Sequence, residues 1–510
     1  MTTPDVTVVV AVFNTMPYLT ECLDSLVAQS IGHDRLEVIA VDDGSTDESG
    51  EVLDAYAAAH PDVFRVIHQP NSGGPASPSN KALDVATGRY VYFLGSDDHL
   101  GTEALERMVD LADEHGSDVV IGKMVGVNGR IVHQGLYEDG NQVDLDPYGP
   151  KLRWAIANTK LFRRDLVERL GLRYREDMPF GSDQPFTLAA CVHARRISVL
   201  ADYTCYYAVK REDSSNISYK TPYEDRVDCI HEMMQSVADL VPAGPDRDTI
   251  LTRHFAWEIP RLLRQDLLES SESAQRAVCA GVRRMAEEWL NDAMLDELPV
   301  SARLRVSAAA REDLALLSEL VQEENTHTDL VHLEGGHALA VLPGFRSSDL
   351  PDRLFRMALV GVEGRLNKLA RLGAVRVEVG RLLVDVVLPV VGPDAASTFW
   401  ASLDPAGPAL ATTTRSDERS ATVTIAVDPG VVASSGDGPW RLVLHGEIDA
   451  GPFDVRVPAP EDDVVSRFRH GARPHRLTAA RARKGKVLSL SVEPVAPREV
   501  VSSLLGRLRR

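Results

Sequence analysis

The first hundred residues alternate between short apolar runs and amphipathic segments. The apolar runs have the length and composition of buried strands, and they are Val6–Phe13, Leu36–Val41, Phe64–His68 and Tyr90–Leu94. Between them the spacing of apolar residues predicts helices after Pro17, over Glu48–Ala59 and over Asn80–Thr87. The order βαβαβαβ predicts an α/β domain with a parallel sheet and right-handed crossovers.

The remaining chain changes character twice. Residues 219–372 are rich in Leu, Ala, Arg and Glu at helical spacing, as in His254–Leu268 and Ala274–Leu290, and predict a mainly helical linker domain. Residues 373–497 carry short apolar runs between Gly, Pro and Asp, which predict an all-β immunoglobulin-like sandwich. Its expected strands are Val375–Val379, Leu382–Val391, Thr398–Leu403, Ala421–Val427, Arg441–Ile448, Phe453–Val457 and Lys486–Val492. The predicted domains are therefore 1–218, 219–372 and 373–497, followed by a basic tail at 498–510.

Composition narrows the class of protein. A chain of 510 residues with 44% hydrophobic and 25% charged residues is typical of a soluble protein of two to four domains. No apolar run approaches the roughly 18 residues of a membrane span, the start lacks the basic region of a signal peptide, and the five cysteines show no CxxC spacing. These features predict a cytoplasmic protein.

Charge is unevenly distributed along the chain. The net charge of −20 argues against general nucleic-acid binding. From Arg467 onward, however, 12 basic residues face two acidic ones, Glu493 and Glu499. This basic end could meet anionic lipid at the inner face of the cell membrane or an anionic polymer, or it could be a solvated, frayed terminus.

Polar turns follow three of the predicted strands. They are Phe13-Asn14, Asp42-Asp43 and Gly95-Ser96-Asp97-Asp98. Open α/β sheets bind ligands at the carboxyl ends of their strands, and Mg²⁺ takes one or two carboxylates together with substrate phosphates. We therefore expect a site for a metal-bound nucleotide diphosphate. The alternative is that Asp97 and Asp98 cap a helix expected over Leu100–Ala112.

Four motifs in order resemble the signatures of family 2 glycosyltransferases, which have the GT-A fold. They are Val8-Val-Val-Ala-Val-Phe-Asn14, Val41-Asp-Asp-Gly-Ser-Thr-Asp47, Asn71-Ser-Gly-Gly-Pro75 and Phe93-Leu-Gly-Ser-Asp-Asp98. The resemblance covers roughly residues 5–215. It implies a Rossmann-like nucleotide-binding domain that uses a UDP-sugar as donor and a divalent metal, Mn²⁺ or Mg²⁺, as cofactor.

The resemblance also implies roles for individual residues. Ala11, Phe13, Asn14 and Asp43 would line the nucleobase pocket, and Asp43 would accept the uracil N–H. Asp97 would approach the ribose or the metal, and Asp98 would bind the metal. The other expected donor-site residues are Asn71, Gly73, Gly74 and Ser96, with Lys210 and Arg211 in a basic loop over the phosphates. This chain departs from many relatives at three positions, with Gly95 in place of Asp, Ser79 in place of Arg and Ser182 in place of Glu.

An inverting sugar transfer needs a carboxylate that takes the proton of the acceptor hydroxyl. Asp183 falls at the Asp of the family's acidic motif, before an aromatic residue and a predicted helix at Gln184–Val192, and we expect it to be this base. Asp177 is the alternative base, or contacts a polar acceptor together with Glu176. Asp183 could also serve as the helix N-cap.

The leading hypothesis is an inverting, metal-dependent glycosyltransferase. It would move a sugar, with GlcNAc as first choice, from a UDP-sugar to a hydroxyl of a cell-surface glycopolymer such as wall teichoic acid, a polyol phosphate. The three-part architecture resembles glycosyltransferases that decorate wall teichoic acids, whose C-terminal part supports homotrimers, so a homo-oligomer is expected.

Two other classes of function are alternatives. The first is a carbohydrate- or polymer-binding protein whose transferase domain is degenerate, motivated by Gly95, Ser79 and Ser182. The second is a nucleotidyltransferase, which the lack of a basic Gly-rich loop in Ala11–Tyr18 disfavours.

Overall fold

The computed structural model describes residues 3–211, 221–326, 330–404, 407–435, 439–470, 473–482 and 486–494. The chain divides into two compact units, Met1–Leu298 with Arg305–Leu314, and Pro299–Leu304 with Ala315–Arg510. The expected basic tail and most of the basic loop after Arg211 lie outside the described residues. The domain boundaries expected from the sequence stay predictions.

A mixed sheet organises the first unit. Its eight described strands run in the order β3-β2-β1-β4-β7-β6-β8-β5. The first four pair in parallel, as the sequence predicts, whereas β7 runs antiparallel between β4 and β6. The strands are β1 (Val6–Val12), β2 (Leu36–Asp42), β3 (Phe64–His68), β4 (Tyr90–Gly95), β5 (His99–Leu100), β6 (Val119–Val127), β7 (Leu161–Arg163) and β8 (Ile197–Val209).

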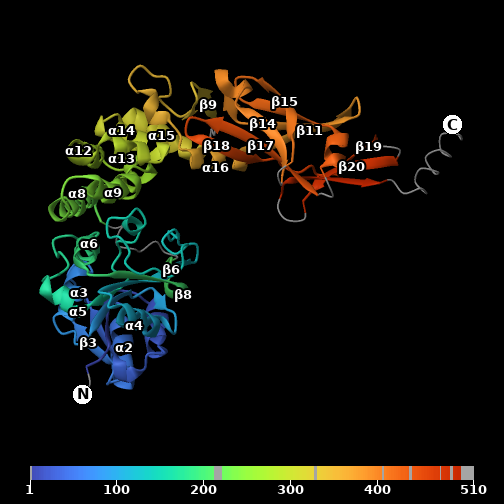
Figure 1. Cartoon of the computed structure of the whole chain (residues 1–510). Coiled ribbons are helices and arrows are strands. Elements are labelled where there is room, and N and C mark those ends of the chain that lie inside the picture. The colour runs from blue at the N-terminus through green and yellow to red at the C-terminus, as the bar shows by residue number, and fades with distance from the viewer. Residues whose placement is uncertain are drawn as a thin grey trace. The chain divides into compact units, whose positions relative to one another are not determined.

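Alternation along the strands gives this sheet two cores. Side chains of a strand point to opposite faces in turn, so Val8 and Val10 join one apolar cluster while Val9 joins the other. Figure 1 shows helices around this sheet, coloured blue to green. The first face packs on α1 (Tyr18–Val27), α2 (Ser49–Ala59) and α4 (Ala104–His115), and the second on α3 (Ala76–Leu83), α5 (Arg164–Arg169) and α6 (Asp183–His193).

Helices continue the first unit beyond residue 220, as the sequence predicts. They are α8 (Tyr223–Leu240), α9 (Pro245–Arg253), α10 (Ile259–Leu262), α11 (Gln265–Leu268), α12 (Glu272–Trp289) and α13 (Asp292–Glu297). The division into units falls within α14 (Val300–Ala310), after Leu304, and α15 (Leu314–Thr326) belongs to the second unit apart from its first residue. Within the described ranges, no helix combines the length and apolarity needed to cross a membrane.

One predicted helix is wrong as a continuous element. The segment His254–Leu268 begins with a turn of π-helix, His254–Glu258 (η3), in which the Ile259 N–H bonds the His254 carbonyl, and then breaks between α10 and α11. Pro260 has no N–H to offer Ala256, so an α-helical ladder cannot pass through it. The hydrophobic spacing does not reveal this break.

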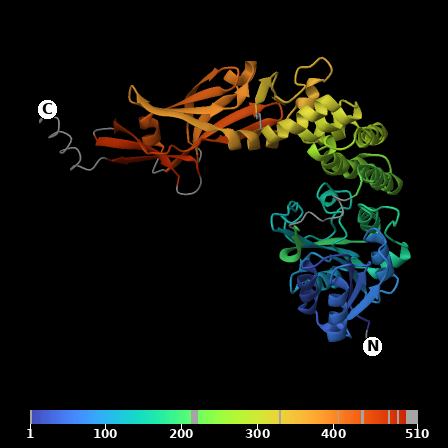
Figure 2. The ribbon, with the colours of Figure 1, turned by 180° about the vertical axis from the view of Figure 1, so that it is seen from behind.

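The second unit is an antiparallel β-sandwich, as expected, with a small three-stranded sheet whose strands pair in the order β10-β9-β13. Long strands, orange to red, are visible from both sides (Figure 1 and Figure 2). Two sheets meet where β14 pairs β15, and their inner faces share one apolar core. Along β16 every second residue is buried, which is the alternation of a strand with one face in a core. The small sheet holds β9 (Val331–Glu334), β10 (His337–Ala340) and β13 (Val390–Val391), and a helix, α16 (Leu359–Leu369), precedes the sandwich.

The seven expected strands of the sandwich all occur, with shifted ends, and three more were missed. The strands are β11 (Arg371–Glu378), β12 (Arg381–Leu388), β14 (Phe399–Asp404), β15 (Ala409–Ser416), β16 (Ala421–Val427), β17 (Trp440–Ile448), β18 (Gly451–Arg456), β19 (Val464–His470), β20 (Arg473–Arg481) and β21 (Leu488–Pro494). The missed strands β15, β19 and β20 are rich in Thr, Ser, Arg and His, so their hydrophobic signal is weak.

A close backbone approach at Gly88 gives a test of the fold. Its N–H donates to Thr7 Oγ1, and a Cβ there would lie 2.4 Å from the Thr7 nitrogen. Gly88→Ala should therefore destabilise the first unit by about 1–3 kcal/mol through overpacking. Thermal unfolding followed by circular dichroism measures this. Gly364→Ala, in open space on α16, serves as the control and should not lower stability; equal melting of both variants would contradict the packing at Gly88.

Candidate functional site

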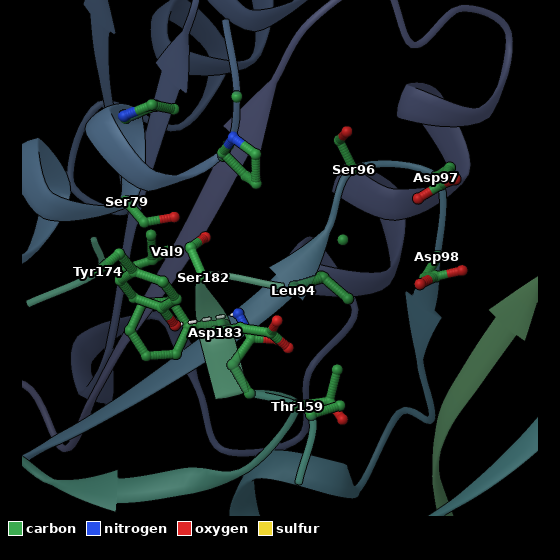
Figure 3. Close-up of a pocket in the computed structure, with 18 of the residues that line it drawn as sticks. Val9, Ser79, Leu94, Ser96, Asp97, Asp98, Thr159, Tyr174, Ser182 and Asp183 are labelled. Carbon is green, nitrogen blue, oxygen red and sulfur yellow. Dashed lines mark hydrogen bonds between the residues drawn. The ribbon is translucent and has the colours of Figure 1, made fainter. Parts of the chain in front are cut away.

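A cavity of about 600 Å³ opens at the carboxyl ends of the central strands. Figure 3 shows part of its lining. The structure brings most of the expected site residues together there, namely Ala11, Phe13, Asp43, Asn71, Gly73, Gly74, Ser96, Asp97, Asp98, Asp183 and Arg211. The three departures from the family pattern, Ser79, Gly95 and Ser182, line it as well.

Asn14 and Lys210 are expected site residues that do not line this cavity. The Asn14 side-chain oxygen accepts the backbone N–H groups of Thr46 at 2.7 Å and Asp47 at 3.3 Å. Asn14 therefore holds the turn after β2 in place. Lys210 is exposed, at the end of the described part of the basic loop.

Asp43 organises the glycine-rich loop. Its carboxylate accepts the backbone N–H of Ser72 at 3.0 Å and the Ser72 hydroxyl at 2.9 Å, and also the Gln69 amide. The Asn71 side chain bonds the Asp43 carbonyl, and Gly73 follows with a left-handed φ of 87°. These bonds hold the Gly73-Gly74 backbone at the cavity wall, where a ligand can approach it closely.

The acidic turn after β4 is tied to β8 on the far side of the site. Asp98 Oδ2 accepts the Tyr206 hydroxyl at 2.5 Å, and Oδ1 accepts the Val209 N–H at 2.7 Å. Asp97 Oδ2 accepts Arg211 Nε at 2.6 Å. Burial, first, and the neighbouring Asp97 charge, second, raise the pKa of Asp98 to about 6. The turn thus holds two carboxylates, of which Asp97 is paired with Arg211 and Asp98 is a buried group with a raised pKa.

The Tyr206 hydroxyl also explains the glycine at position 95. A Cβ on Gly95 would lie 2.9 Å from Asp98 Oδ2 and 3.1 Å from the Tyr206 oxygen. A larger side chain at position 95 would therefore displace the Asp98 carboxylate, the Tyr206 hydroxyl or both.

The helix-capping alternatives are wrong for both acidic motifs. The N-cap of α4 is Glu103, so Asp97 and Asp98 lie upstream of the cap position. The N-cap of α6 is Ser182, and Asp183 is the first helical residue, with no side-chain capping bond recorded at that end. The three carboxylates are not explained by helix termini.

Asp183 lies on a wall of the cavity apart from the acidic turn. Figure 3 shows it beside Ser182, Tyr174 and Thr159, with Asp97 and Asp98 on another part of the lining. Burial raises the pKa of Asp183, against the opposing effects of its own backbone N–H, that of Asn158, Arg253 and Lys160. A carboxyl with a raised pKa is a stronger base than an exposed one.

An aromatic cluster fixes the position of Asp183. Phe186, on the next turn of α6, stacks on Tyr174 with ring centroids 4.7 Å apart and contacts Phe93 of β4 edge-on at 5.5 Å. The Tyr174 hydroxyl accepts the Asn158 amide at 3.0 Å. The helix that carries Asp183 is thus packed against the strand that leads to Asp97 and Asp98.

Asp177, the alternative base, lies outside the cavity lining. Its carboxylate is paired with the Arg175 guanidinium at 2.6 Å, which lowers its pKa, and its side chain is 66% exposed. Glu176 accepts the Asn80 amide, which also bonds the Tyr174 backbone. Both residues brace the loop before α6.

Sequence reasoning missed Arg130 and Tyr206. Arg130 lines the cavity, bonds the Val209 carbonyl at 2.9 Å and favours the ionised form of Asp98. It lies in an irregular stretch without a motif. Tyr206 lies in an aromatic stretch of β8, and nothing in that stretch indicates that its hydroxyl reaches Asp98.

The acidic turn fits a divalent cation that shares its coordination with a substrate. Among the described residues, no group of three or more His, Cys, Asp or Glu side chains is placed to hold a metal by itself. Asp97 and Asp98 supply carboxylate oxygens, and a carboxylate has lone pairs beyond those used by its hydrogen bonds. Two carboxylates with diphosphate oxygens form an ordinary Mg²⁺ or Mn²⁺ site.

Two family models match this chain. Residues 7–171 match the model described as glycosyl transferase family 2. Residues 224–321 match the model of the glycosyl transferase TarS linker domain. The first match covers the sheet domain as far as α5 and leaves out α6 and β8, and the second runs from α8 into α15.

Curated relatives carry related names. The chain is 29% identical over 359 residues to the poly(ribitol-phosphate) beta-glucosyltransferase of Bacillus spizizenii, covering 69% of this chain and 56% of the relative. It is 35% identical over 259 residues to the poly(ribitol-phosphate) beta-N-acetylglucosaminyltransferase TarS of Staphylococcus aureus, covering 49% of this chain and 44% of that relative. The uncharacterized glycosyltransferase EpsJ of Bacillus subtilis is 30% identical, covering 44% of this chain and 67% of EpsJ. The chain spans about half the length of the first two relatives.

Solved structures agree on the fold. The crystal structure of S. aureus TarS has a TM-score of 0.63 at 21% identity, covering 97% of this chain and 86% of that chain. The structure of S. aureus TarS 1-349 in complex with UDP-GlcNAc has a TM-score of 0.56 at 25% identity, covering 68% and 98%. The fold class predicted from the sequence is confirmed.

The Tyr206–Asp98 bond gives a pH-dependent test. The pKa of Asp98 is raised to about 6 in the folded chain, so the folded state holds this proton more tightly than the unfolded state does. The free energy of unfolding therefore falls as the pH rises from the ordinary pKa of an aspartate towards 6. Tyr206→Phe removes a donor from the charged form and should cost about 1–3 kcal/mol above pH 7, with a smaller cost near pH 5. Denaturant unfolding at both pH values measures this. Tyr137→Phe, whose hydroxyl bonds a backbone carbonyl, is the control; a cost that is the same at both pH values would contradict the bond to a carboxylate.

Proposed function

The chain belongs to glycosyl transferase family 2, and we propose that it transfers N-acetylglucosamine from UDP-GlcNAc to a hydroxyl of a polyol-phosphate glycopolymer, with inversion at the sugar. The observation that supports this proposal best is a single cavity with carboxylates on two of its walls. One wall holds Asp97 and Asp98, which can bind a divalent cation together with a diphosphate, and the other holds Asp183, whose pKa is raised. The polymer class and the sugar rest on the relatives, two of which are named for poly(ribitol-phosphate) and one for N-acetylglucosamine transfer.

The donor side of the site would hold the UDP part. Phe13 and Ala11 lie beside Asp43, which can accept an imide N–H of a base on its remaining lone pairs. Asp97 and Asp98 would hold Mn²⁺ or Mg²⁺, which when bound supplies positive charge to the diphosphate leaving group. Arg130 and Arg211, both in the lining, add guanidinium charge for phosphate oxygens.

The acceptor side of the site would activate the hydroxyl. Asp183 takes the hydroxyl proton as the oxygen forms a bond to the anomeric carbon. The bond between that carbon and the phosphate oxygen breaks, and UDP leaves with the electron pair. Asp183 suits this role better than Asp177, because Asp177 lies outside the lining and is paired with Arg175.

Asp183→Asn tests the base. Transfer to poly(ribitol phosphate) should fall at least about a hundredfold, because the amide cannot take the proton, while UDP affinity stays within about twofold. Radiolabelled sugar transfer and calorimetry with UDP measure the two effects. Asp177→Asn is the matched control and should keep its activity; a control that loses as much activity would contradict the choice of Asp183.

Asp98→Ala tests the donor site. Binding of UDP should be stronger with Mn²⁺ than without it in the natural chain, and this difference should vanish in the variant. Calorimetry of both proteins with and without Mn²⁺ measures this. If UDP does not bind the natural chain, the transferase domain is degenerate, and a polymer-binding protein becomes the better assignment. A parallel assay with UDP-glucose decides the sugar, since one relative is a glucosyltransferase.

Two wider proposals accompany this function. The C-terminal sandwich would support a homo-oligomer, with a trimer as first choice, which light scattering can test. The enzyme would work in the cytoplasm, and its basic tail, residues 498–510, which lies outside the described residues, would contact anionic lipid at the membrane.

A further inference from the structure

A buried polar cluster is attached to the residue next to Asp183. Gln184 follows Asp183 in the first turn of α6 and lines the main cavity. Its side-chain oxygen accepts Arg253 Nη1 at 3.1 Å, and its side-chain nitrogen donates to Glu258 Oε1 at 3.2 Å. Arg253 Nη1 also donates to Glu258 Oε1. We call Gln184, Arg253 and Glu258 the Gln184 network.

The π-helical turn brings Arg253 and Glu258 together. Arg253 ends α9, and Glu258, five residues later, ends η3. Residues five apart in an α-helix point about 140° away from each other, because each residue turns the helix by about 100°. A π turn closes its hydrogen bonds over five residues, so such residues lie nearly above each other. The irregular turn thus pairs a cation with an anion next to the helix that carries Asp183.

Burial of the Gln184 network is costly. The side chains of Arg253 and Glu258 are only 11% and 5% exposed. Arg253 Nε and Glu258 Oε2 are buried and have no hydrogen-bond partner among the described residues. Apolar residues of similar size often replace a buried ion pair with no loss of stability. The pair therefore points to a role beyond the stability of the fold.

Arg253 is one of two cations that favour the ionised form of Asp183. Burial raises the pKa of Asp183, and Arg253 and then Lys160 oppose this rise after two backbone N–H groups. The other titratable groups around them are Tyr174 and His254. Burial raises the pKa of Tyr174, lowers that of Lys160 to about 8 and lowers that of His254 to about 4. Between about pH 5 and 7, therefore, Lys160 stays largely a cation, and Tyr174 and His254 stay largely neutral.

We propose that Arg253 is a positioning residue for the sugar transfer. With Glu258 it fixes Gln184 and the first turn of α6, and it places a positive charge near the carboxylate that takes the acceptor proton. This inference rests on the proposed function, in which Asp183 is the base. The helices after residue 220 thereby take part in the reaction without touching the reacting atoms.

Two substitutions in the ion pair test the role of charge, because they act on Asp183 with opposite sign. Arg253→Gln removes the cation, so the midpoint of the acid limb of kcat should rise by about 0.5–1 pH unit. Glu258→Gln removes the anion that opposes Arg253, so the same midpoint should fall. Arg253→Lys keeps the charge and should keep the natural midpoint. The measurement is radiolabelled transfer from UDP-GlcNAc to poly(ribitol phosphate), with saturating donor and Mn²⁺ so that Asp98 stays ionised.

Arg163→Gln is the matched control. It removes the cation of another ion pair, formed with the buried Asp118 at 2.9 Å, and Arg163 does not line the main cavity. This variant should lose thermal stability and keep the natural midpoint. Thermal unfolding checks that each variant folds, and if Arg253→Gln does not, Glu258→Gln decides. A midpoint that stays at the natural value in Glu258→Gln, or that moves the same way in both variants of the pair, would show that the positioning role is wrong.

The titration of Asp183 can also be followed without turnover. Infrared difference spectra across the acid range, with the Asp183 carboxyl band identified from Asp183→Asn, should show the same two opposite changes in midpoint. If the natural chain transfers no sugar while the band responds in this way, the proposed function is wrong and the coupling of Arg253 to Asp183 stands. If the band does not respond, the role of Arg253 is wrong even where the natural chain transfers sugar.

Discussion

The buried carboxylate of Asp98 is the constraint on which the site depends. It is bonded to a side chain and a backbone N–H of β8, so the turn that ends β4 cannot move independently of that strand. Burial beside Asp97 makes ionisation costly in the absence of a cation. A cation bound at this site would lower that cost and so stabilise the folded chain. The site thus has a lower stability when empty, which favours binding.

The two walls of the cavity reach a similar electrostatic state by different means. Burial and a second carboxylate disfavour the anionic form of Asp98. Burial also disfavours the anionic form of Asp183, but two backbone N–H groups, followed by Arg253 and Lys160, partly offset this effect. The Asp97–Asp98 wall therefore suits a bound cation, whereas Asp183 suits the acceptance of a proton. Aromatic packing between Phe93, Tyr174 and Phe186 holds the helix that carries Asp183 in a fixed position relative to the strand that leads to Asp97 and Asp98.

The parts of the fold that the sequence reveals are those with a strong local signal. Short apolar runs predict β1 to β4. The polar turns after these strands predict where the carboxylates of the cavity lie, because parallel strands bring their carboxyl ends to one edge. The antiparallel strand β7 is three residues long, and β19 and β20 are rich in arginine, so neither length nor alternation marks them. Arg130 and Tyr206 could not be predicted for another reason: their contacts depend on a loop path and on how β8 lies against the acidic turn, which tertiary packing decides.

The glycine at position 95 links the acidic turn to β8. A Cβ there would lie 2.9 Å from Asp98 Oδ2 and 3.1 Å from the Tyr206 oxygen, the two atoms that are hydrogen-bonded to each other. A larger residue at position 95 would therefore require one or both of these side chains to shift. Positions 95, 98 and 206 are thus epistatic: the effect of a substitution at one depends on the residues at the other two.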